Sequence, residues 1–148
     1  MFTDPQVAHV GLRESEARAR GMNVEVAHMP FAGIARAIET DETAGVMKLI
    51  IDPSDERILG VTLVGADAGE LIHIFLPLIQ AHASARSIAD AEFIHPTFAE
   101  GVQALVTSLP RYALDFWFGS SPARSAAAAR PRTDAQGARA AGSKYSRQ

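Results

Sequence analysis

The 148 residues of this chain include no cysteine. Without a thiol, the chain can form no disulfide bond, supply no thiolate nucleophile and build no zinc–thiolate site. The sequence also lacks the G-x-G-x-x-G fingerprint, which cradles the phosphates of a dinucleotide at the turn between a strand and a helix. We therefore expect this chain by itself to bind neither FAD nor a nicotinamide nucleotide.

Long apolar segments are missing as well. The most apolar run, residues 71–79, is interrupted by His73 and Pro77 and is far shorter than the roughly 20 residues that span a membrane. The N-terminus does not show the basic and apolar pattern of a secretion signal. These features predict a soluble, cytoplasmic protein without a membrane partner.

Charge and histidine spacing disfavour two other kinds of partner. The net charge is −3, but residues 121–148 carry six basic residues and one acidic residue, which leaves −8 on residues 1–120. Because this excess negative charge repels phosphates, we expect no nucleic-acid binding by the folded part. No metal site is predicted either, since the histidines form no H-x-x-x-H pair and lie scattered at His9, His28, His73, His82 and His95.

Composition divides the chain into one domain and a tail. Residues 120–148 are rich in alanine, arginine and serine and offer almost nothing to bury, so we predict a disordered basic tail. Residues 1–119 are long enough for a single domain. Aromatic side chains crowd its end, and they could pack on this domain, on a second subunit or on another domain: Tyr112, Phe116, Trp117 and Phe118.

The first half of the chain alternates short strands with short helices. A strand is predicted between Pro5 and Gly11, a second at residues 24–31, and a hairpin from residues 46–51 and 58–64 around a turn at 52–55. A helix is predicted at residues 14–20, with Ser15 as its cap and Gly21 as its stop. Residues 33–40 are predicted to form a helical or irregular link.

A longer helix is predicted after Asp67 and Glu70, which form a capping-box pattern. Its main apolar stripe has helical spacing, and Ile72 and Leu76 are apolar on another face. Burial on two sides is therefore expected, with another subunit on the second side. Pro77 is predicted to kink or shorten this helix. The stripe consists of Leu71, Ile74, Phe75, Leu78 and Ile79.

Residues 95–100 read His-Pro-Thr-Phe-Ala-Glu. Pro96 suits the first position of a helix and keeps His95 extended, so we expect His95 at the helix mouth and Glu100 just over a turn inside. Helical side chains lean toward the N-terminus, so the Glu100 carboxylate should reach the His95 imidazole and fix its tautomer. A base oriented by an acid is suited to proton transfer near neutral pH. The alternative is an exposed histidine and glutamate at a helix start.

The helix that follows Glu100 has one apolar face and is predicted to end at Pro110. That face consists of Val102, Leu105, Val106 and Leu109.

The His-Pro-Thr-x-x-Glu pattern resembles the C-terminal signature of the FAD-dependent pyridine nucleotide–disulfide oxidoreductases. Three other stretches are similar to this family in the same order. They are Thr-x-Pro-x-x-Ala-x-Val-Gly-x-x-Glu at residues 3–14, Gly-x-x-Lys at 45–48 and Gly-x-x-Ala-x-Glu at 65–70. The resemblance runs from residue 3 to about residue 109 and implies that the chain begins close to a domain boundary.

The resemblance implies an isolated C-terminal dimerisation domain of the α+β class. Its fold would be an antiparallel β-sheet of about four to five strands with helices packed on one face. The chain would form a homodimer in which His95 is the acid/base catalyst, Glu100 orients it, and both reach the partner subunit's active site. A retained His95 points to a disulfide or dithiol substrate, as in dihydrolipoamide dehydrogenase. The interface would include Leu71, Ile74, Phe75, Leu78, Pro96 and Thr97.

FAD and NAD(P) would be held by other domains of the parent enzyme, which are also possible partners of this chain. The competing interpretation is a non-catalytic, stand-alone dimerisation module from a truncated or split gene. In both cases this chain alone is expected to be inactive.

Overall fold

The structure is a computed structural model, and residues 3–112 of it are described. Its centre is an antiparallel sheet of four strands, which agrees with the predicted α+β class. The predicted boundary at residue 119, the tail and three of the four clustered aromatic residues lie outside the described residues. In spatial order the strands are β1 (Val7–Gly11), β4 (Ile58–Val64), β3 (Val46–Ile51) and β2 (Glu25–Pro30).

The predicted hairpin is confirmed, with β3 and β4 at the expected residues. Met47 pairs with Leu63, and Leu49 pairs with Val61, so these four side chains share one face of the sheet. All four are fully buried. Lys48, one residue along β3, therefore lies on the opposite face.

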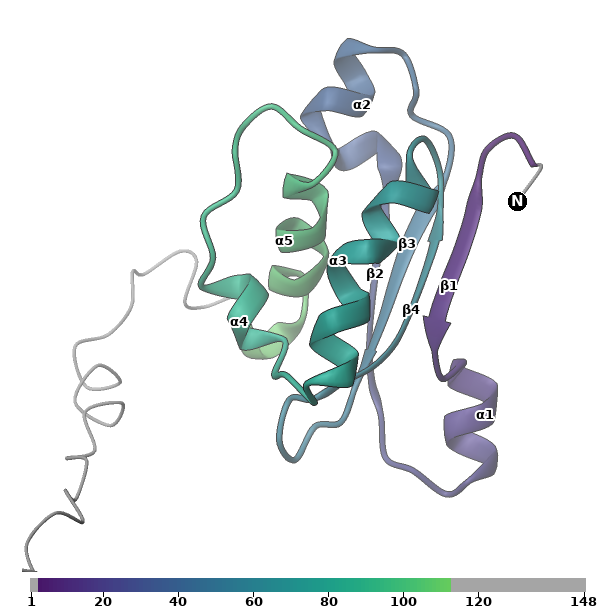
Figure 1. Cartoon of the computed structure of the whole chain (residues 1–148), viewed down its shortest axis with the longest axis vertical. Coiled ribbons are helices and arrows are strands. Elements are labelled where there is room, and N and C mark those ends of the chain that lie inside the picture. The colour runs from purple at the N-terminus through teal and green to yellow at the C-terminus, as the bar shows by residue number, and fades with distance from the viewer. Residues whose placement is uncertain (1–2, 113–148) are drawn as a thin grey trace, which may run out of the picture.

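Helices cover the face of the sheet that carries Leu49. α3 (Ala68–Gln80) packs on β1 and β4, and α5 (Glu100–Thr107) packs on β2 and β3. Figure 1 shows these two helices side by side in front of the sheet, with α4 (Arg86–Ala89) next to α5. The predicted apolar face of the last helix is confirmed, since Val102, Leu105, Val106 and Leu109 are all fully buried.

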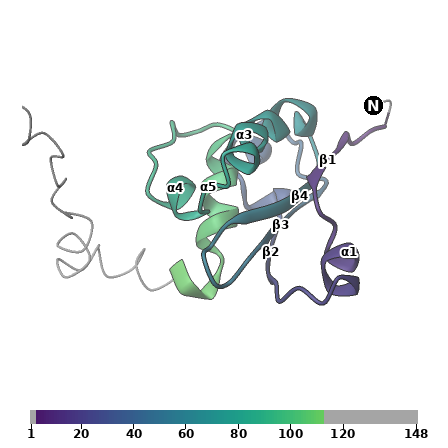
Figure 2. The same cartoon turned by 60° about the horizontal axis from the view of Figure 1, so that its bottom comes forward.

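Three shorter helical segments complete the fold: α1 (Glu14–Ala19), η1 (Phe31–Gly33) and α2 (Ala35–Glu39). They confirm the predicted helix after β1 and the predicted link after β2. In Figure 2, α1 lies apart from the other helices, beyond the end of β1. Its Glu14 forms an ion pair with Lys48, on the sheet face opposite α3 and α5.

The predicted cap of α1 is wrong, and α3 has Asp67 at the predicted cap position without the predicted capping bond. Asp67 precedes α3 with a left-handed backbone (φ 54°), and its side chain makes no cap hydrogen bond. Gln6 Oε1 instead accepts the Gly69 N–H at 3.0 Å, so a residue just before β1 caps α3. Ser15 lies inside α1, because this helix begins at Glu14. The Glu16 carboxylate accepts the N–H of Arg13, the residue before the helix, at 2.9 Å.

Pro77 does not shorten its helix. α3 continues through Pro77 to Gln80, and Ala81 N–H still donates to the Pro77 carbonyl at 2.9 Å. The predicted shortening is therefore wrong, and the alternative, a kink at Pro77, stays a prediction. None of the helices within residues 3–112 is long and apolar enough to cross a membrane.

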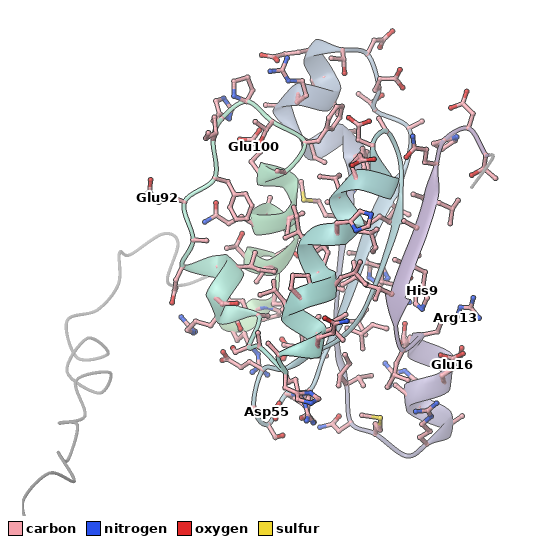
Figure 3. All side chains as sticks on the ribbon, viewed as in Figure 1. His9, Arg13, Glu16, Asp55, Glu92 and Glu100 are labelled. Atoms are coloured by element: carbon pink, nitrogen blue, oxygen red, sulfur yellow. The ribbon has the colours of Figure 1, made fainter. Side chains whose placement is uncertain are left out.

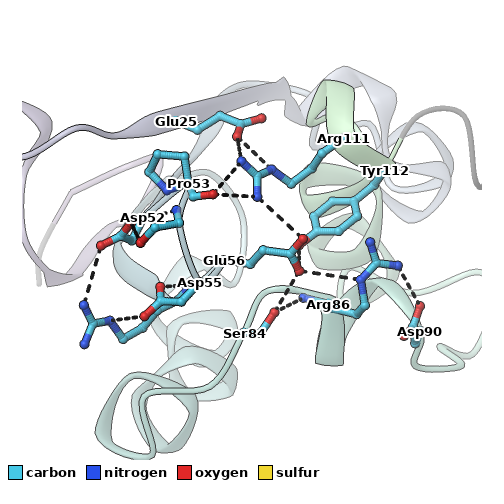
Figure 4. A network of polar contacts seen from close by, with 12 residues as sticks. Glu25, Asp52, Pro53, Asp55, Glu56, Ser84, Arg86, Asp90, Arg111 and Tyr112 are labelled. Carbon is cyan, nitrogen blue, oxygen red and sulfur yellow. Dashed lines mark hydrogen bonds and ion pairs between the residues drawn. The ribbon is translucent and has the colours of Figure 1, made fainter. Parts of the chain in front are cut away.

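Arg111 and Tyr112, the last described residues, are bound to the sheet by a network of hydrogen bonds and ion pairs, drawn in Figure 4. Arg111 Nε donates to the Glu25 carboxylate at 2.8 Å, and its Nη1 and Nη2 approach the Pro53 carbonyl at 3.3 Å. Tyr112 donates its hydroxyl to Glu56 at 2.9 Å. The segment that follows α5 is thereby tied to β2 and to the β3–β4 turn.

Candidate functional site

His95 lies on the long loop that connects α4 to α5 (Figure 1). Figure 3 shows Glu92 on this loop and Glu100 at the start of α5. The helix begins at Glu100, so the prediction that Pro96 opens it, with Glu100 a turn inside, is wrong. The Thr97 hydroxyl donates to the Ile94 carbonyl at 2.7 Å and accepts the Glu100 N–H at 3.2 Å. These bonds close a turn over residues 94–97, and the helix begins after this turn, at Glu100.

The contact predicted between His95 and Glu100 is present. His95 Nδ1 lies 2.6 Å from Glu100 Oε2, with 71% of the His95 side chain and 19% of the Glu100 side chain exposed. An ionised carboxylate only accepts hydrogen bonds, so Nδ1 carries the proton of this pair. Nε2 then keeps the free lone pair of the neutral ring, and no group within residues 3–112 bonds to it.

Gln103 anchors the entry to this loop. Its Nε2 donates to the carbonyl oxygens of Ala89, at 3.1 Å, and Ala91, at 2.5 Å. α5 therefore holds the loop at its entry through Gln103 and at its exit through the bond from Glu100 N–H to Thr97. We did not identify Gln103 from the sequence, where the only signal is an amide on a mostly apolar helix.

The predicted interface residues occupy two different environments. Leu71 and Phe75 are 6% and 0% exposed, because they already belong to the core of this chain. Ile74 and Leu78 on α3, together with Pro96 and Thr97 beside His95, are half-buried and remain the interface candidates. The sequence-based prediction did not include Ile94, an isoleucine next to His95 that is 80% exposed.

A second polar group lies on the sheet face opposite α3 and α5. Hydrogen bonds from Lys48 and Arg18 lower the pKa of Glu14 from 4.5 to about 2. A shallow hollow of about 600 Å³ adjoins this group and includes no residue of the His95 loop. Within residues 3–112, no three histidine, aspartate or glutamate side chains are grouped so as to hold a metal ion. Most of the hollow is lined by Arg13, Glu14, Arg18, Val46, Lys48 and Thr62.

Comparison with known families agrees with the resemblance found in the sequence. Residues 1–106 match the family described as pyridine nucleotide-disulphide oxidoreductase, dimerisation domain. The chain belongs to this family. It is 39% identical to dihydrolipoyl dehydrogenase of Vibrio cholerae, over 74% of this chain and 24% of that enzyme. It is 36% identical to leghemoglobin reductase of Vigna unguiculata, over 70% of this chain and 20% of the relative.

Solved structures agree with this assignment. The HOCl-induced flavoprotein disulfide reductase RclA from Escherichia coli matches 72% of this chain and 24% of its own, with a TM-score of 0.69 and 33% identity. LpdA from Mycobacterium tuberculosis matches with a TM-score of 0.67 at 23% identity, which supports the fold alone. The chain is thus a dimerisation domain of dihydrolipoyl dehydrogenase type that spans about a quarter of the length of these relatives.

Residues 3–112 do not form the arrangement in which a dinucleotide such as FAD is commonly bound. Dinucleotides bind where a strand turns into a helix within a parallel strand–helix–strand unit. Every strand pair within residues 3–112 is antiparallel, and the sequence has no glycine-rich turn of that kind.

Proposed function

We propose that this chain is the interface domain of a cytoplasmic, homodimeric, FAD-dependent NAD(P)H:disulfide oxidoreductase of dihydrolipoyl dehydrogenase type. In this proposal it donates His95 and Glu100 to the active site of the partner subunit. The supporting observation is the 2.6 Å contact between His95 Nδ1 and Glu100 Oε2, together with the 71% exposure of the imidazole. A chain without cysteine can use such a pair only on a thiol that lies outside itself.

The chemistry of the pair follows from its two ring nitrogens. A thiol has a pKa of about 8.5 and is mostly protonated at neutral pH. Nε2 accepts the proton as one substrate thiol attacks, and it returns the proton when a thiol leaves. Nδ1–H keeps donating its hydrogen bond to the Glu100 carboxylate throughout. The carboxylate thereby stabilises the imidazolium that exists between the two proton transfers. FAD and NAD(P) belong to other domains in this proposal.

The test is His95→Gln in an enzyme where the flavin and cysteine domains accompany this one. Loss of a general acid–base catalyst should lower disulfide turnover by about 10² to 10⁴-fold. Reduction of the flavin by the nicotinamide should continue, because it does not use this proton. Glu100→Gln should be milder, since the imidazole remains. Full turnover by His95→Gln, or loss of both half-reactions together with the fold, would refute the catalytic role.

The competing function is a non-catalytic dimerisation module, and the absence of cysteine and of a dinucleotide fingerprint is the observation that favours it. The coding sequence upstream of Met1 separates the two functions. In-frame flavin and cysteine domains, or a partner gene that encodes them, support the oxidoreductase. Under either function the purified chain should be colourless and should not reduce disulfides with NAD(P)H.

A further inference from the structure

The segment formed by η1 and α2 contacts the loop of the proposed catalytic pair at two points and the first turn of α5 at a third. The rings of Phe31 and Phe98 have centroids 6.3 Å apart and are tilted by 40°. Ile34, only 1% exposed, packs so closely on α5 that a methyl group added at Gly101 would lie 2.5 Å from its Cδ1. Arg36 Nη2 donates to the Pro96 carbonyl at 2.9 Å.

We propose that Arg36 is a positioning residue for the His95–Glu100 pair. Pro96 directly follows His95, so the guanidinium binds the peptide backbone that adjoins the imidazole. Gln103 holds the entry of the loop, and Thr97 closes the turn that contains His95 and Pro96, whereas Arg36 binds this turn from a separate part of the fold. The effect of Arg36 on turnover rests on the proposed function, but its effect on the tautomer of the His95 imidazole does not.

The Arg36 side chain is itself oriented. Its Nη1 lies 3.4 Å from Glu39 Oε2, on the same helix, while Nη2 faces the Pro96 carbonyl. A hydrogen bond from a charged donor is shorter and stronger than one between neutral groups. Since 41% of this side chain is exposed, we expect its main effect on loop geometry, not on the stability of the fold. Catalytic groups are sensitive to such geometry, because a displacement of about 1 Å can lower a rate about 10²-fold.

The first experiment uses this chain alone, with ¹⁵N-labelled histidine. The nitrogen chemical shifts of the His95 ring report which nitrogen carries the proton. We expect the Nδ1–H form in the native chain and a mixture of both tautomers in Arg36→Ala. Arg36→Lys should keep part of the native signal, because its ammonium group can donate to the same carbonyl.

The matched control is Arg18→Ala, which removes another partly exposed arginine that is paired with a glutamate on its own helix. Arg18 lies on α1 and should leave the His95 spectrum unchanged. Native-like ring shifts in Arg36→Ala would overturn the proposal. If Arg36→Ala fails to fold, Arg36→Gln is measured in its place, and unchanged shifts there overturn the proposal equally.

The second experiment measures turnover in the enzyme with its flavin and cysteine domains. Arg36→Ala should lower kcat by about 10- to 100-fold with little change in KM. In a His95→Gln background the same substitution should cause no further loss, because the group that it positions is gone. An additive loss would overturn the positioning role. Full turnover by His95→Gln would instead refute the proposed function and leave the result on the ring intact.

Discussion

The Tyr112 hydroxyl donates a 2.9 Å hydrogen bond to Glu56 Oε2, across 56 positions of sequence (Figure 4). Ser84 Oγ donates to the same oxygen at 3.1 Å, and Arg86 Nε lies 3.5 Å from it. Burial raises the pKa of Glu56, but the hydrogen bonds from Tyr112 and Ser84, together with the charges of Arg86 and Arg111, outweigh burial and hold the pKa below its usual value. Burial, followed by the bond to Glu56, raises the pKa of Tyr112.

We expect Tyr112→Phe to lower the free energy of unfolding by about 1.5–3 kcal/mol, the range for hydrogen bonds to charged groups. Phenylalanine keeps the ring that Arg86 contacts at 4.7 Å, so the loss of stability reports the contribution of the hydroxyl alone. Urea unfolding measures it. Ser87→Ala removes an exposed hydroxyl bound only to a backbone carbonyl and should change stability by less than about 0.5 kcal/mol. Equal effects of the two substitutions would contradict this account.

The pair formed by Glu14 and Lys48 predicts sensitivity to acid. The pKa of Glu14 is lowered to about 2 in the fold, against 4.5 as its ordinary value. The unfolded chain therefore binds this proton more readily, and the stabilisation is complete above about pH 4.5 and lost as pH falls toward 2. Glu14→Gln should flatten the fall of the melting temperature across this window.

Lys48→Met is the partner variant for this test, because it removes the cation that bonds most strongly to Glu14. It should flatten the same part of the curve, and the double variant should add little to either single variant. A melting curve of Glu14→Gln that falls with acid as steeply as that of the native chain counts against the pair.

Sequence patterns identified the elements of this fold whose signal is local. Alternation in β3 and β4 and the apolar face of α5 depend on neighbours a few residues away, and the structure agrees with both. The contact between His95 and Glu100 was also expected from their spacing. It persists although the helix starts at Glu100, since a separation of five residues lets the side chains meet in a turn as well.

The contacts that sequence patterns did not predict join residues far apart in the chain. Arg36 meets Pro96 across 60 positions, and Gln6 caps α3 across 63. No periodic signal encodes such pairs, because they form only once the sheet order places their elements together. Asp67 illustrates the same limit, since its capping pattern is present in the sequence while its backbone adopts the left-handed region.

Gly101 provides a test of the packing behind the site. In a helix interior, replacing glycine by alanine normally stabilises the helix by about 1 kcal/mol. At Gly101, however, the new methyl group would lie 2.5 Å and 2.8 Å from Cδ1 and Cγ1 of buried Ile34. We expect Gly101→Ala to destabilise the chain by about 1–3 kcal/mol despite its helix propensity, as overpacked cores do.

Ile34→Val supplies the control for that prediction, because it removes the Cδ1 atom that the new methyl group meets first. In urea unfolding, the double variant should be less destabilised than the sum of the two single variants. Additive losses would mean that Gly101 is required for another reason.

Self-association is the final prediction and concerns the apolar surface around His95. We expect the chain to sediment as a dimer at concentrations of tens of micromolar, because a two-fold interface buries the same patch twice. Ile94, 80% exposed and adjacent to His95, is the most accessible apolar side chain there. Ile94→Asp should raise the dissociation constant about 100-fold, at about 1.4 kcal/mol for each of the two copies.

The comparison variant is Ile38→Asp, which places the same charge on the other strongly exposed isoleucine, 61% exposed on α2. It should weaken the dimer far less, because the interface is predicted to run along α3 and the His95 loop. An equal loss from both variants would indicate general apolar association in place of a specific two-fold contact. A native chain that sediments as a monomer at tens of micromolar would contradict the dimer outright, because interfaces of about 2,000 Å² or more hold such domains together.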